Sequence, residues 1–176
     1  MPARRKSRQK ALQVLFLWDL GKMPISAAIE MYYSELFGAE LEEETGEESP
    51  PAPRDAFLEA LARGTVQNLE TLDRLIAQRA ERWRLDRMPV VDRNILRMAI
   101  HEMKYEGTPP AVVIDEALEL AKRYSEEEAV PFLNGVLDAV RRLIESEESL
   151  PDAKSGKDAV QDVVSRGGAG DGVDRT

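Results

Sequence analysis

The sequence predicts an all-α protein, folded as a compact bundle of about seven helices. Apolar residues recur every three or four positions in several separate segments, and glycines, prolines or polar clusters stand between these segments. No segment shows the alternation of a half-buried strand, and neither an internal repeat nor a long heptad series is present. With 176 residues, 43% of them hydrophobic, the chain is long enough to bury a core.

The first helix is predicted from Ala11 to Leu20, and Gly21 is expected to end it, because glycine is common just past a helix C-terminus. Its buried face is formed by the apolar residues Ala11, Leu12, Leu15 and Trp18, widened by Val14 and Phe16. A second helix is expected to begin with Ser26 as its N-cap and to reach about Phe37.

The middle of the chain contains a long helical pattern from residue 54 to about 80, which fits one bent helix or two, with an interruption near Gly64. A short segment around Trp83 and Leu85 leads to Pro89. A further helix is predicted for 92–105, with its apolar residues Ile95, Leu96, Ala99, Ile100 and Met103 facing inward.

Two more helices complete the bundle, one over 114–124 and one that opens near Pro131, where a first-turn proline is tolerated. The last helix buries Leu133, Val136, Leu137, Val140 and Ile144, and Phe132 lies about 100° away from the line through Leu133. Gly135 is expected to permit the close approach of another helix.

Two segments are too polar to join a core. Residues from about 40 to 53 are rich in glutamate and proline, which predicts a flexible acidic insertion or, alternatively, a competitor for the basic end of the chain. Residues 149–176 are rich in glycine and aspartate and predict a disordered tail. The expected domain therefore spans residues 1–148.

The first ten residues carry five basic and no acidic side chains, on a chain whose formal net charge is -9. They run directly into the first predicted helix, and if this helix extends back through them, Arg4 and Arg8 lie on the face that Leu12 and Leu15 bury further on. Because an unpaired buried guanidinium group is costly, the first turns are expected to overhang the bundle. Such a basic block favours an anionic partner, most commonly a nucleic acid.

Catalytic, metal and membrane functions have little support in the composition. The chain has no cysteine and a single histidine, His101, and its glycine cluster lies in the tail rather than in a phosphate loop. No apolar run approaches the roughly 20 residues that span a bilayer. We therefore expect a cytoplasmic protein that is not an enzyme and that has no metal or cofactor.

Four segments together resemble the NusB transcription antitermination factors. They are RRKSRQKALQVLFLWDL from Arg4, VVDRNILRMAIHEM from Val90, PPAVVIDEALELAKRY from Pro109 and PFLNGVLDAVRR from Pro131. The resemblance implies two packed three-helix lobes. It also implies binding to the boxA element of ribosomal RNA leader transcripts, jointly with the small-subunit ribosomal protein NusE, within the RNA polymerase antitermination complex.

Matched position by position, the resemblance assigns RNA contacts to Arg4, Arg5, Lys6, Arg8 and Phe132. It assigns partner contacts to Phe16 and Glu128. If about four cations neutralise phosphates, the logarithm of the affinity falls with the logarithm of salt at a slope of roughly -3.

Alternatives remain at this stage. Phe132 and Phe16 also fit core positions, and Val130 and Pro131 replace the polar or basic residues that relatives often have before this phenylalanine. A homodimer that hides the basic end is compatible with the sequence. Other functions to weigh are a helical protein-interaction module and an accessory factor in ribosomal RNA maturation. Methyl transfer by this chain alone does not fit, because no glycine-rich α/β segment follows the helices.

Overall fold

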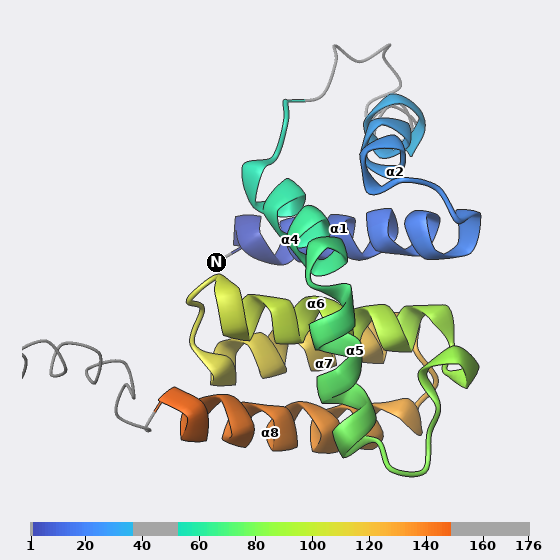
Figure 1. Cartoon of the computed structure of the whole chain (residues 1–176). Helices are drawn as coiled ribbons and strands as arrows, with labels where there is room; N and C mark the ends of the chain where they lie inside the picture. Colours follow the sequence, from blue (N-terminus) through green and yellow to red (C-terminus); the bar gives the residue numbers. More distant parts are fainter. Residues whose placement is uncertain (1, 37–52, 149–176) are drawn as a thin grey trace, which may run out of the picture.

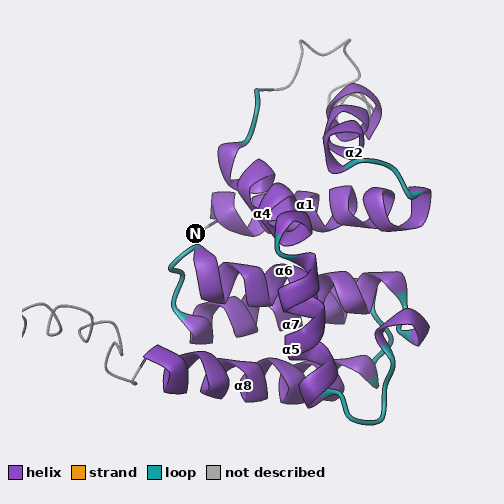
Figure 2. Ribbon diagram, in the orientation of Figure 1, coloured by secondary structure: helices purple, strands orange, loops and turns teal. Residues whose placement is uncertain are grey.

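The computed structural model describes residues 2–36 and 53–148, and all regular structure within these ranges is helical (Figure 2). The all-α prediction is therefore confirmed. The predicted acidic insertion, apart from Pro53, and the predicted tail lie outside the described residues.

Seven α-helices occur in the described residues. They are α1 (Pro2–Gly21), α2 (Ile25–Met31), α4 (Ala56–Gln67), α5 (Leu69–Arg79), α6 (Val90–Tyr105), α7 (Pro110–Tyr124) and α8 (Ala129–Glu148). A π-helical turn, η1 (Tyr32–Leu36), continues α2, and a 3-10 turn, η2 (Leu85–Arg87), precedes α6.

The helices form two lobes of three, as the resemblance implies (Figure 1). Helices α1, α2 and α4 pack on one another in the first lobe, and α6, α7 and α8 pack on one another in the second. Both α1 and α4 also lie against α6, which joins the lobes. Helix α5 follows α4 and contacts α6 and α8.

Helix α6 is the centre of the fold, and every residue from Asn94 to Met103 is buried. Its apolar residues face inward as predicted, but Asn94, Arg97, His101 and Glu102 are buried with them. Each buried polar group left without a partner costs about 1–3 kcal/mol. Asn94, Arg97 and Glu102 receive partners from neighbouring helices, at the two ends of α1, whereas His101 is hydrogen-bonded to Glu106 just past the end of α6.

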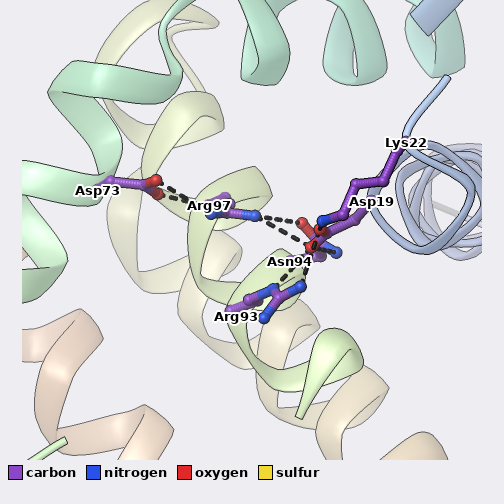
Figure 3. Close-up of polar contacts among 6 residues, drawn as sticks. All are labelled: Asp19, Lys22, Asp73, Arg93, Asn94 and Arg97. Atoms are coloured by element: carbon purple, nitrogen blue, oxygen red, sulfur yellow. Dashed lines mark hydrogen bonds and ion pairs between the residues drawn. The ribbon is translucent and has the colours of Figure 1, made fainter. Parts of the chain in front are cut away.

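At the C-terminal end of α1, Asp19 accepts hydrogen bonds from three residues of α6 (Figure 3). Arg93 donates to both carboxylate oxygens at 2.6 and 2.8 Å, and Asn94 and Arg97 donate at 3.0 and 3.2 Å. Arg97 also donates twice to Asp73 of α5, at 2.7 and 3.0 Å. This network, defined by these five residues, ties α1, α5 and α6 together.

The predicted N-cap of the second helix is wrong. Helix α2 begins at Ile25, directly after Pro24, and Ser26 makes no capping hydrogen bond at its start. Pro24 occupies the N-cap position and has no side-chain acceptor, so the helix starts without a side-chain cap. In the π-helical turn that follows, Tyr32 is fully buried and the Tyr33 hydroxyl accepts a hydrogen bond from the backbone N–H of Asp55 at 2.8 Å.

The interruption predicted near Gly64 lies instead at Asn68, between α4 and α5. Asn68 bonds the Gly64 carbonyl through both its backbone N–H and its side-chain amide, at 3.1 and 2.8 Å. Gly64 itself is inside α4, where its backbone faces the buried ring of His101 on α6. The glycine therefore serves a close approach of two helices and does not break the helix.

The variant Gly64→Ala is expected to lower the free energy of unfolding by about 1–3 kcal/mol, because its Cβ would overlap the His101 ring and force a shift in the core. Urea unfolding followed by circular dichroism measures this change.

Gly135→Ala is the matched control. The expectation that Gly135 permits a close helix approach is wrong, because no heavy atom of another helix lies within 4 Å of the position that its Cβ would take. Alanine there should stabilise α8 by up to about 1 kcal/mol. Equal stabilities of the two alanine variants would contradict this account.

Candidate nucleic-acid interface

Three contacts fix the first turns of α1 against the rest of the molecule. Ser7 donates a hydrogen bond to Asp55, the N-cap of α4, at 2.6 Å. Arg8 donates to both oxygens of Glu102 on α6, at 2.8 and 2.5 Å. Arg5 donates to Glu116 on α7, with a shortest distance of 2.8 Å. The basic end of the chain is therefore a rigid part of the fold.

Arg8 occupies a different environment from the one expected for it. It is 5% exposed, so the expectation that the first turns overhang the bundle is wrong at this position. The desolvated guanidinium group is compensated by Glu102, and Glu116 lies 3.8 Å away. For Arg8 to contact an RNA from this position, its buried ion pair with Glu102 would have to break. In this structure Arg8 instead holds the start of α1 on α6.

Arg4, Arg5 and Lys6 are exposed on the first two turns of α1. The guanidinium carbon of Arg4 lies 4.7 Å from the ring centre of Phe57 on α4, a cation–π distance. The Arg5 side chain is 62% exposed although it is paired with Glu116. Arg4 and Arg5 are positioned by these contacts, and all three cations are open to solvent.

A groove of about 330 Å³ runs between α1 and α7 beside these cations. Arg5 and Gln9 line it from α1, and Lys122 and Arg123 line it from α7, together with Glu116, Glu119 and Leu120. Hydrogen bonding from Arg5 is the largest cause of a lowered pKa at Glu116. Both this carboxylate and its partner arginine are therefore charged at neutral pH.

Sequence reasoning missed Lys122 and Arg123 in this groove. Basic residues in the last turn of a helix are common because they complement the helix dipole, so their positions alone did not indicate a role. The hydrogen bond between Gln9 of α1 and the hydroxyl of Tyr124, 2.5 Å long, brings the end of α7 to the basic end of α1.

The other predicted residues lie elsewhere. Phe132 is half-buried in the first turns of α8, with its ring centre 5.7 Å from that of Trp83, and Glu128 is exposed just before the same helix. Phe16 is half-buried in the second half of α1. Helix α8 begins on the opposite side of the molecule from the start of α1 (Figure 1). The structure therefore does not bring Phe132 next to Arg4 and Arg5.

Among residues 2–36 and 53–148, no three histidine, aspartate or glutamate side chains come together as ligands for a metal ion. None of the described helices is long and apolar enough to cross a bilayer.

Comparisons with known proteins agree with this architecture. The NusB family model matches residues 5–142. The transcription antitermination protein NusB of Solibacter usitatus is 53% identical over 142 residues, which cover 81% of this chain and 90% of that protein. The NusB protein of Koribacter versatilis is 43% identical, with 82% and 92% covered.

Two solved structures have the same fold. NusB of T. maritima is 33% identical with a TM-score of 0.63, over 79% of this chain and 90% of that one. A chain from a crystal structure of the antitermination factors NusB and NusE in complex with dsRNA is 27% identical with a TM-score of 0.63, over 81% and 98%. From the family match and the close relatives, the chain belongs to the NusB family.

Proposed function

We propose that this protein is an RNA-binding transcription antitermination factor that recognises boxA-type RNA of ribosomal RNA leader transcripts together with NusE. It acts by binding and not by catalysis. The single observation that carries the proposal is the row of exposed cations, Arg4, Arg5 and Lys6, on a helix start that three tertiary contacts hold in place. The antitermination role of its relatives, and the presence of NusE and dsRNA in a related structure, support the partners.

The three exposed cations contact phosphates, and the two arginines also offer planar faces on which bases stack. Since the helix is already ordered, little side-chain and backbone entropy is lost when RNA binds, compared with a flexible basic tail. Arg8 contributes by positioning α1 through its pair with Glu102. On this proposal Phe132 contacts a base, while Phe16 and Glu128 belong to the surface that meets NusE.

The triple variant with Arg4, Arg5 and Lys6 replaced by alanine is expected to lose most of its RNA affinity at moderate salt. Losing three phosphate contacts to a single-stranded RNA should make the slope of log affinity against log salt less steep by about 2. Titrating labelled boxA RNA at several salt concentrations, with and without NusE, measures both effects.

The matched control for this experiment is Arg74→Ala. Arg74 is exposed on α5 and pairs with Glu70 of its own helix, so it should not change the affinity or the slope. A scrambled RNA tests specificity. Equal binding of boxA and scrambled RNA under all conditions would overturn the proposal, and NusE binding without any RNA binding would favour a protein-interaction module.

A further inference from the structure

The segment from Arg79, the last residue of α5, to Arg87 connects α5 to α6 and is called the connector here; it is basic on an acidic protein. Its sequence, RAERWRLDR, contains four arginines against two carboxylates, whereas the whole chain has a net charge of -9. Arg84 pairs with Asp86 at 2.9 Å. Within the described parts of the chain, Arg79, Arg82 and Arg87 are exposed and make no ion pair. The connector therefore carries a local excess of positive charge that is separate from the basic end of α1.

Trp83 stands in the middle of this connector and is 58% exposed. Its ring is tilted by 52° against that of Phe132, with 5.7 Å between the ring centres. The backbone is fixed on both sides, because the N–H of Trp83 bonds the Ala80 carbonyl at 2.9 Å and η2 follows directly. The indole is therefore held in place on one side and open on the other.

A hollow of about 490 Å³ lies beside the indole. Ala77, Ala80 and Leu85 contribute apolar surface to it. Arg82 and Arg84, the neighbours of Trp83 in the sequence, also line it. A flat aromatic ring flanked by guanidinium groups is the combination that single-stranded nucleic acids meet on their binding proteins, with bases on the ring and phosphates on the cations.

We infer that Trp83 is a base-stacking platform, and that the connector forms a second contact for single-stranded RNA, with the unpaired Arg82 placed for a phosphate. This inference rests on the proposed function and extends it. An anionic strand is favoured over a protein partner because three of the four arginines have no carboxylate partner in the described residues.

The connector and the basic start of α1 are at opposite sides of the molecule (Figure 1). Helix α1 has 20 residues and is therefore roughly 30 Å long. The distance between the two regions is of this order. An RNA that touches both regions must therefore cross the molecule, and a shorter RNA can occupy only one of them. Binding should thus depend on Trp83 for long RNAs and lose that dependence for short ones that reach only the basic end.

The test compares Trp83→Leu and Trp83→Phe with the wild-type protein, using labelled boxA RNA with its flanking leader sequence. Leucine keeps an apolar side chain but cannot stack, and phenylalanine keeps a stacking face. Trp83→Leu should weaken binding by roughly tenfold, and Trp83→Phe by much less. Thermal unfolding of each variant checks that the fold is kept, as expected for a residue this exposed.

Two further readouts make the assignment specific. RNA should quench the fluorescence of the wild-type protein and have little effect on Trp83→Phe, whose remaining tryptophan, Trp18, is half-buried. A series of RNAs that each lack one base locates the stacked base. When that base is missing, wild-type and Trp83→Leu should have the same RNA affinity, because neither protein can then stack on it.

The outcomes separate the two proposals. If the wild-type protein binds no RNA, the proposed function fails. If it binds RNA but Trp83→Leu binds equally well without a change in quenching, only the second contact is overturned. If Trp83→Leu keeps its RNA affinity and loses NusE, the connector is a protein interface and the inference is wrong.

Discussion

The variant Glu102→Gln is expected to lower the free energy of unfolding by about 3 kcal/mol, since it leaves the buried guanidinium group of Arg8 without a full counter-charge. Arg8 is 5% exposed and Glu102 1%, so water cannot replace the lost carboxylate. Glu116, at 3.8 Å from Arg8, offers partial compensation and keeps the loss at the lower end of the range for broken buried pairs. Urea unfolding at neutral pH measures the change.

The double variant Arg8→Met/Glu102→Leu is the control. Replacing both partners of a buried pair with apolar residues of similar volume leaves no uncompensated charge, so it should recover most of the stability. A double variant as unstable as Glu102→Gln would show that packing, and not charge, decides the loss. Unchanged stability in Glu102→Gln would contradict the burial of the pair.

The same variant separates position from charge at the interface. Glu102→Gln keeps Arg4, Arg5 and Lys6, but weakens the contact that holds Arg8 on α6, because one acceptor oxygen and the negative charge are lost. If a rigid helix start contributes to RNA affinity, the folded variant should bind RNA more weakly than the wild type although its net charge is more positive.

Helical periodicity predicted the all-α fold class and most of the helices, because each helix buries apolar residues on one face. On α8 the five residues predicted to be inside, from Leu133 to Ile144, are all buried. Starts of helices were less predictable: α6, α7 and α8 begin at Val90, Pro110 and Ala129, two to four residues before the predicted positions. Prolines at 89, 109 and 131 permit a helix to begin around them, and the sequence does not say on which side.

The partner of Arg8 could not be predicted. Glu102 is 94 residues away in the sequence. Its sequence context is that of any exposed glutamate on a helix, and nothing in it indicates burial. The same reason explains Gly64, whose role depends on His101 of another helix. Trp83 lies in a segment too short for any period, so its exposure became evident only from the packing of the connector.

Asp19 is the second position where a large effect is expected. The variant Asp19→Asn should destabilise the protein by about 3 kcal/mol at neutral pH, since it leaves Arg93 without a counter-charge and presents an amide N–H₂ group to donors of α6 (Figure 3). Arg97 keeps its bonds to Asp73, which limits the loss. Glu70→Gln, at a 91% exposed carboxylate, is the control and should change stability by less than about 0.5 kcal/mol.

The pH dependence of this difference identifies the carboxylate as its cause. Burial by itself would raise the pKa of Asp19, but hydrogen bonds from Arg93 and Asn94 and the charges of Arg93 and Arg97 outweigh it and lower the pKa from 3.8 to about 2. The unfolded chain therefore takes up a proton at Asp19 before the folded protein does. Stability from this group is complete above about pH 5 and is lost as the pH falls towards 2, by about 2–3 kcal/mol in total.

Asp19→Asn has no such proton uptake at this position, so the two unfolding free energies should converge between about pH 4 and pH 2. A difference that stays constant over this interval would mean that the asparagine acts through its shape and not through the missing charge. Convergence would instead show that an ion pair at the end of α1, far from the exposed cations at its start, sets how firmly this helix is held on α6.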